Sequence, residues 1–256
     1  MNYLDCNYSR NFISQVIIRV DFLEFVPTER LFSDALINEI IKKFPKKGMQ
    51  QVIRFEDVSV FLEPDTSTTK RKTEEGLQQQ FSNSENNKII LSNKFFVLEI
   101  NAYSNYENTI AMMEPVFRSI LSSFQLTSVR TGIRYINIYE DGQIRLTKNL
   151  FSTDIGTSVN LKLSEDNNGL NCLRSMTLRE YKFNDMRVNF RFGMYNPEFP
   201  NLMRHANFVL DYDCFCEEQI CGYDAIMNHI EEGHNAIQHL FETSISDKLK
   251  GIMKSE

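Results

Sequence analysis

A short strand pattern occurs twice in this chain and constrains its architecture more than any other feature. The segment Phe-Val-Leu-Glu-Ile at 96–100 reappears as Phe-Val-Leu-Asp-Tyr at 208–212, and an amphipathic helical pattern follows each copy. Two strand-plus-helix units in one chain are typical of a mixed α and β protein. The repetition fits either an internal duplication or a chance similarity in a chain with 20 Phe residues.

The rest of the chain alternates between strand and helix patterns. Residues 12–22 show the two-residue period of a half-buried strand, residues 32–44 the spacing of an amphipathic helix, and the polar run 63–76 predicts an exposed loop. We therefore predict an α+β fold in which antiparallel sheets are each packed by amphipathic helices, with two strand-plus-helix halves. The halves are 1–145 and 146–256, and one continuous domain is the alternative.

Composition narrows the class of protein and the kind of partner. A 256-residue chain with 42% hydrophobic residues is globular, and its net charge of −6 argues against wholesale wrapping of nucleic acid. The start of the chain lacks the basic and apolar regions of a secretory signal, and no apolar run approaches the roughly 20 residues of a membrane helix. With five cysteines, an odd number, the sequence predicts a cytoplasmic protein with reduced thiols and no membrane partner.

Two groups of residues superficially resemble metal-ligand sets. The first set is Cys214, Cys216, Cys221 and His205. In an extended strand from 205 to 214 the imidazole would lie roughly 30 Å from the first thiol, too far to share a zinc ion. The second set is His229, His234 and His239. A spacing of five points successive rings about 140° apart on a regular helix, so we expect no metal site and no cofactor.

The sequence contains no local motif for catalysis. The Gly-x-Ser-x-Gly elbow is absent, and 10 Gly residues leave little room for phosphate-binding loops. Asp211 and Asp213 share one face of a predicted strand, which is equally typical of a solvated face. We expect no catalytic residues, although an active site assembled from distant strands would leave no local pattern.

Arginines on two predicted strands form the strongest local signal for binding. In strand geometry Arg130 and Arg134 project to one side, as do Arg187 and Arg191 on the second strand. If the strands are neighbours, they form a cationic plate suited to carboxylate or phosphate. The alternative is that these side chains pair across strands with Glu99, Glu180 or Asp211. The predicted binding residues are Arg130, Arg134, Asn137, Arg187 and Arg191.

Three segments together suggest a family. The segment Arg-Thr-Gly-Ile-Arg-Tyr-Ile-Asn at 130–137, the strand Leu-Asp-Tyr-Asp at 210–213 and the spacing of His234, Ile237, Phe241 and Glu242 resemble a prokaryotic family. This sporadically distributed family has proteins of about 250 residues and unassigned function. The resemblance spans most of the chain and implies an accessory gene of the kind common in defence and toxin-associated systems. It carries no site residues over to this sequence.

The sequence thus predicts a non-enzymatic protein–protein interaction component. It would be a subunit, immunity protein or antitoxin-like partner in a prokaryotic defence or conflict system, bound to another protein subunit or to its own copies as a homo-oligomer. The alternative is a module that binds an anionic ligand or nucleic acid through the arginine-bearing sheet face, with nucleic acid the less favoured partner because of the acidic net charge.

Overall fold

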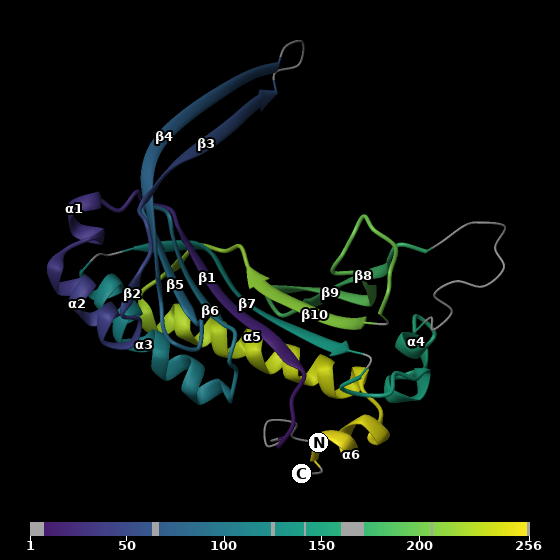
Figure 1. Ribbon diagram of the computed structural model, residues 1–256. Helices are drawn as coiled ribbons and strands as arrows, with labels where there is room; N and C mark the ends of the chain where they lie inside the picture. The colour runs from purple at the N-terminus through teal and green to yellow at the C-terminus, as the bar shows by residue number, and fades with distance from the viewer. Residues whose placement is uncertain are drawn as a thin grey trace.

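The computed structural model describes residues 8–62, 67–123, 126–140, 142–159, 172–205 and 207–254 (Figure 1). The strands are β1 Ile13–Phe22, β2 Lys46–Lys47, β3 Gln51–Leu62, β4 Ser67–Ser82, β5 Lys88–Ser92, β6 Phe95–Ile100, β7 Thr127–Glu140, β8 Ser175–Phe183, β9 Met186–Tyr195, β10 Asn207–Cys216 and β11 Ile220–Cys221. The helices are α1 Thr28–Leu31, α2 Asp34–Lys43, α3 Tyr106–Ser123, the short 3-10 helix η2 Lys148–Leu150, α4 Thr153–Gly156, α5 Tyr223–Ser244 and α6 Asp247–Lys254.

All the described strands belong to one antiparallel sheet of 11 strands. Its order is β2-β4-β5-β6-β1-β7-β10-β9-β8, while β11 pairs with β7 and β3 pairs with β4. At the centre, β7 pairs with β1 on one side and with β10 on the other, so that Ile17 opposes Arg134 and Asp211 opposes Ile136. Strands from both ends of the chain therefore share one continuous ladder of backbone hydrogen bonds.

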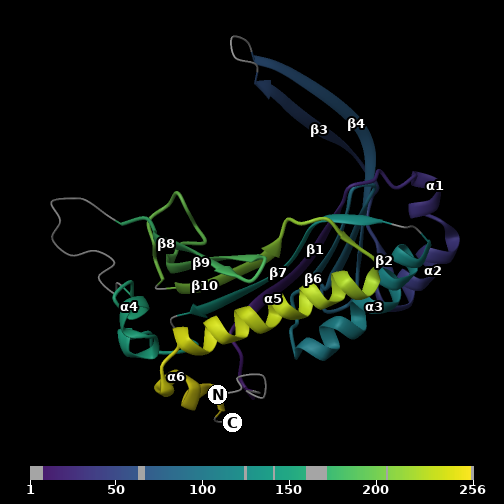
Figure 2. The same ribbon diagram turned by 180° about the vertical axis from the view of Figure 1, so that it is seen from behind.

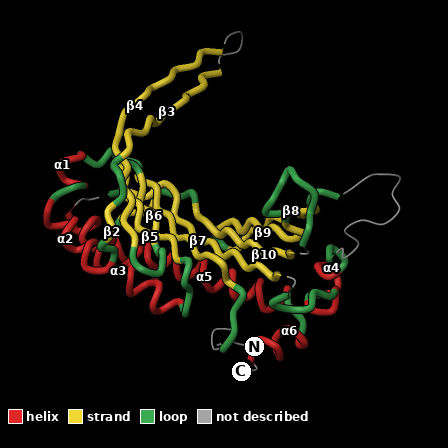
Figure 3. Tube along the Cα trace, viewed as in Figure 1, coloured by secondary structure: helices red, strands yellow, loops and turns green. Residues whose placement is uncertain are grey.

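The prediction of separate sheets, each packed by its own helices in two halves, is wrong. The long helices lie mostly against one side of the single sheet, which is seen from behind in Figure 2 and by secondary structure in Figure 3. Periodicity identifies a strand but not its neighbour, and the β1–β7 and β7–β10 pairings join segments far apart in sequence. The division at residue 145 stays a prediction, although the strands on either side of it are paired.

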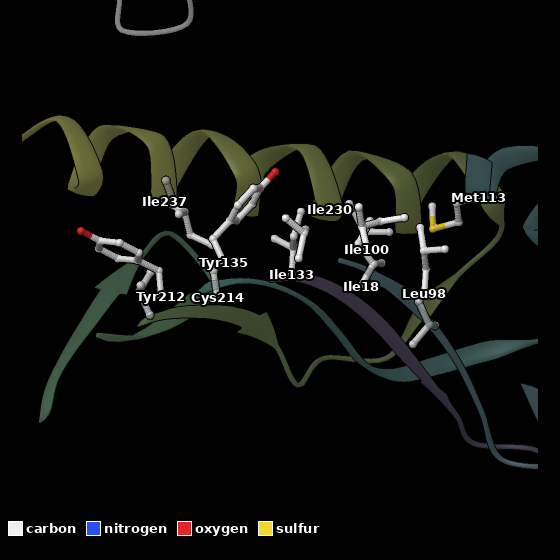
Figure 4. Packing of buried hydrophobic residues seen from close by; sticks show 14 of the residues in the cluster. Ile18, Leu98, Ile100, Met113, Ile133, Tyr135, Tyr212, Cys214, Ile230 and Ile237 are labelled. Atoms are coloured by element: carbon white, nitrogen blue, oxygen red, sulfur yellow. The ribbon is translucent and has the colours of Figure 1, made fainter. Parts of the chain in front are cut away.

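Helix α5 packs along the sheet and defines its helix side. Its buried stripe includes Ile226, Ile230 and Ile237. In Figure 4, Ile230 and Ile237 face the sheet, whose labelled side chains include Ile18 and Ile133. These strand residues alternate with half-buried ones that point to the opposite face, which we call the open side. The core thus lies between one face of the sheet and the helices.

The hairpin of β3 and β4 projects away from the sheet (Figure 1). The predicted loop at 63–76 is wrong for residues 67–76, which form the polar arm of β4. An arm that faces no core needs no apolar residues, so its sequence resembles a loop.

None of the helices in the described part of the chain has the length and apolar character needed to span a membrane.

Gly233 sets how closely α5 approaches the sheet. A Cβ atom at this position would lie 2.9 Å from Ile133 Cγ2 and 3.1 Å from Met186 Cε, closer than normal contact. Gly251 in α6 has open space where its Cβ would lie. The same substitution therefore has opposite effects at the two helical positions.

We expect Gly251→Ala to raise the free energy of unfolding by about 0.5–1 kcal/mol, because alanine lowers the entropy cost of the helix. We expect Gly233→Ala to lower it by about 1 kcal/mol or more, because the methyl group overpacks the contact with β7. Urea denaturation of both variants measures the difference. Equal stabilisation by both would contradict the close approach of α5.

Candidate functional site

The five predicted binding residues lie on two different sides of the sheet. Arg130 and Arg134 of β7 point to the open side, as do Arg187 and Arg191 of β9, which is joined to β7 through β10. Asn137 is an odd number of residues from Arg134 on the same strand, so it points to the helix side, where it is buried. The structure therefore brings the four arginines to one face and separates Asn137 from them.

Asp211 on β10 lies between the two arginine-bearing strands. Arg134 donates from Nε to Asp211 Oδ1 at 2.7 Å and from Nη2 to Asp211 Oδ2 at 2.7 Å, a bidentate pair. Arg191 Nη1 lies 3.4 Å from Asp211 Oδ2. The Asp211 side chain is 8% exposed, so these guanidinium groups compensate its buried charge.

The other two arginines also lie near carboxylates. Arg130 Nη2 is 3.7 Å from Asp213 Oδ1, and Arg187 Nη1 is 3.7 Å from Glu217 Oε2. Burial raises the pKa of Asp213, and the nearby Arg130 opposes this shift. Each of the four arginines therefore has a carboxylate within salt-bridge distance, and Arg134 and Arg191 share Asp211.

A cavity on the helix side forms a second candidate site. It has a volume of about 150 Å³ and lies between α5, strands β7 and β10, the N-terminal segment and the start of α3. Its lining consists of Tyr8, Asn11, Ile13, Tyr103, Ser104, Asn105, Tyr106, Glu107, Tyr135, Asn137, Tyr212, His234, Ile237, Gln238, Phe241, Glu242 and Met253. Asn11, Ser104 and Glu107 are exposed at its rim, whereas Asn137, Tyr135 and Tyr212 are buried at its base.

Aromatic rings and one histidine form the most ordered part of this lining. The Tyr135 hydroxyl and His234 Nδ1 share a hydrogen bond of 2.9 Å. The His234 ring stacks on Tyr106 with 3.9 Å between ring centroids and an interplanar angle of 1°. Figure 4 shows Tyr135 rising from the sheet toward α5, the helix that carries His234. The pair of rings is thus fixed between α3, β7 and α5.

Burial favours the neutral forms of His234 and of four tyrosines in the cavity. Desolvation lowers the pKa of His234 to about 4, although Glu107 favours its charged form. Desolvation also raises the pKa values of Tyr103, Tyr106, Tyr135 and Tyr212. At neutral pH these five side chains are therefore uncharged groups that can donate or accept hydrogen bonds.

Among the described residues that line the cavity, Glu242 is the one buried charged group. It is 3% exposed, accepts a hydrogen bond of 2.7 Å from the Tyr8 hydroxyl, and lies 3.2 Å from Lys250 Nζ. This ion pair neutralises the carboxylate. The sequence singled out Asn137 and His234 but missed the cavity, because its lining comes from segments between residue 8 and residue 253. The feature of the sequence that could have indicated the cavity is the presence of polar side chains on otherwise apolar strand and helix faces.

The cysteines and histidines considered as metal ligands remain apart. Cys214 and Cys216 are buried on the helix side of β10, whereas Cys221 is exposed on β11. Within the described part of the chain, no group of three or more His, Cys, Asp or Glu side chains is arranged to hold a metal ion. The remaining candidate binding surfaces are the open side, the sheet edges and the cavity.

Comparison with known proteins finds no matching family model, no matching curated protein and no matching solved structure.

We expect Arg134→Ala to lower the free energy of unfolding by about 2–3 kcal/mol, because it leaves the buried Asp211 carboxylate without its bidentate partner. The matched control is Arg187→Ala, whose side chain is 69% exposed and should change stability by less than about 0.5 kcal/mol. Chemical denaturation of both variants tests this. Equal changes in the free energy of unfolding would show that the Arg134–Asp211 pair contributes no more to stability than the exposed Arg187.

We expect the His234 ring to titrate at about pH 4 in NMR spectra of the folded protein. The unfolded chain takes up this proton near the ordinary value of 6.5, so the folded state binds fewer protons between these limits. Acidification from pH 6.5 to 5 should therefore cost about 2 kcal/mol of stability through this residue. His234→Asn identifies the resonance by its loss. A His234 pKa near 6.5 would contradict the burial of the neutral ring.

Proposed function

We propose that this protein is a non-enzymatic protein–protein interaction component that assembles with a second copy of itself through strand β8. The observation that carries the proposal is a concentration of exposed apolar side chains. Of eleven large hydrophobic residues exposed in the described part of the chain, seven lie between residues 176 and 202. They are Met176, Leu178, Tyr181, Phe183, Tyr195, Phe199 and Leu202. On β8 they divide between the two faces of the sheet, with Met176 and Leu178 on the open side and Tyr181 and Phe183 on the helix side, so both faces of this edge carry exposed apolar side chains.

Strand β8 lies at the edge of the sheet and is open to another strand. Among the described residues it pairs only with β9, and eight of its nine residues are exposed. The backbone groups on its outer edge can pair with an added strand, a common mode of protein recognition. The loop after β9 carries the exposed Phe199 and Leu202, and it lies close to the start of β8, since Arg174 Cζ is 4.1 Å from the centre of the Phe199 ring.

The charges of β8 favour a second copy of this chain as the partner. In an antiparallel pair related by two-fold symmetry, a register centred on Tyr181 places Glu180 opposite Lys182 of the other copy, and this occurs twice. Registers centred on Arg179, Glu180 or Lys182 would instead oppose two like charges. The same three charges would disfavour pairing with strands of unsuitable sequence.

The biological setting is proposed on the family resemblance. A sporadically distributed prokaryotic gene of this kind fits a subunit, immunity protein or antitoxin-like partner, and the four described cysteines are free thiols, as in a cytoplasmic protein. The alternative of an anionic ligand or nucleic acid on the open side has less support, because each candidate arginine has a nearby carboxylate.

We expect the protein to form dimers at micromolar concentration in native mass spectrometry and light scattering. Glu180→Lys and Lys182→Glu should each weaken dimerisation about tenfold, because each turns two opposite-charge pairs into like-charge pairs. The double variant Glu180→Lys/Lys182→Glu should restore it. Glu75→Lys, which changes an exposed carboxylate on the β3–β4 hairpin, is the matched control.

Two results would contradict this assembly. One is that the protein stays monomeric at all concentrations tested. This result contradicts the proposal even if β8 binds a different protein. The other is a dimer whose affinity is the same in the single charge variants and the double variant, since its contact would then lie elsewhere.

A further inference from the structure

The cavity on the helix side has the properties of a ligand site, independently of any assembly through β8. Its volume of about 150 Å³ is below the 300–1,000 Å³ of drug-sized pockets but matches a cavity that holds one benzene-sized ring. The lining is strongly aromatic, with Tyr8, Tyr103, Tyr106, Tyr135, Tyr212 and Phe241. A planar ligand of one small ring system therefore fits both its size and its walls.

Two buried polar side chains at the base have unused capacity for hydrogen bonds. The Tyr212 residue is 0% exposed. The Ser244 side chain lies near the Tyr212 hydroxyl, but among the described residues this hydroxyl has no partner of hydrogen-bonding geometry. A buried hydroxyl without a partner costs about 1–3 kcal/mol, which a ligand atom would recover.

Asn137 is the second polar side chain at the base. It is 3% exposed, and the hydrogen bond from its Nδ2 to the Leu210 carbonyl is long, at 3.4 Å. A carboxamide offers a donor and an acceptor side by side, the pattern that asparagine uses to bind the edge of a purine base. The ligand that suits this base of the cavity therefore carries adjacent donor and acceptor atoms on a flat ring.

The charges around the cavity favour a neutral ligand. Glu242 is paired with Lys250, and His234 is held in its neutral form by burial. The described lining residues include no arginine or lysine to pair with a phosphate or carboxylate group. The exposed Glu107 at the rim would also repel an anion. An uncharged base thus fits better than a nucleotide.

We propose that this cavity binds an uncharged nitrogen heteroaromatic of nucleobase size, held by stacking on its tyrosines and recognised by Asn137 and Tyr212. Stacking on aromatic side chains with hydrogen bonds to the ring edge is how proteins bind unpaired bases. The rim residues Asn11 and Ser104 lie where the ligand would enter from solvent.

The test is calorimetric titration of the full chain with adenine, hypoxanthine, cytosine and uracil, beside adenosine monophosphate and tetramethylammonium. We expect at least one free base to bind at micromolar concentration, and the monophosphate and the cation to bind at least tenfold more weakly. Tighter binding of tetramethylammonium would assign the tyrosines to an aromatic cage for organic cations and overturn the proposal. Failure of all four bases to bind below 1 mM would overturn it as well.

Tyr212→Phe separates ligand recognition from a purely structural role. The variant keeps the ring and removes an unpartnered buried hydroxyl, so the folded protein should be at least as stable, while the affinity for the base falls about tenfold or more. Tyr139→Phe is the matched control, because Tyr139 also has a buried hydroxyl without a partner but does not line the cavity. Its affinity should stay unchanged.

Asn137→Leu provides a second test and should also weaken binding about tenfold, because it removes the adjacent donor and acceptor. Unchanged affinity in both Tyr212→Phe and Asn137→Leu would show that the base binds elsewhere.

Discussion

Strand β7 is the element on which the rest of the molecule depends, because it pairs along its length with both β1 and β10. These two ladders place the strands that precede and follow it in a single sheet. Without them, α5 would have no surface formed jointly by Ile18 of β1 and Ile133 of β7 on which to pack. The distant partners must meet before their hydrogen bonds can form, so the central pairing carries the main entropic cost of the topology.

The same strand connects the two sides of the sheet. Arg134 and Tyr135 are neighbours in sequence, yet one pairs with Asp211 on the open side and the other meets His234 in the cavity wall. Toward the start of α5, the stripe of isoleucines packs in an apolar core. Toward its end, tyrosines and Asn137 replace aliphatic residues, and a cavity with polar groups takes the place of close packing.

Much of the local structure could be predicted from the sequence. The alternation of 12–22 corresponds to β1, and the amphipathic helical pattern after 208–212 corresponds to α5, because each element has a periodic face that contacts the core. The β4 arm could not be predicted, since it faces no core. Asp211 was named as a partner for the arginines, but only the strand order shows that it lies between them.

The cavity was beyond prediction for a different reason. Tyr8, Tyr106, Tyr212 and Glu242 share no spacing, and only the folded chain brings them together. The residue type does not indicate a cavity either, since a tyrosine on a strand face, such as Tyr212, is usually part of the core.

The alternation along β7 also affects how the sequence of this protein can change. A substitution at Arg134 alters one side of the sheet and leaves the cavity untouched, while a substitution at Tyr135 does the reverse. A single-residue insertion or deletion would instead exchange the two sets of side chains and place guanidinium groups inside the core. Point mutations can thus change either surface separately, whereas the number of residues within the paired length of β7 must stay fixed.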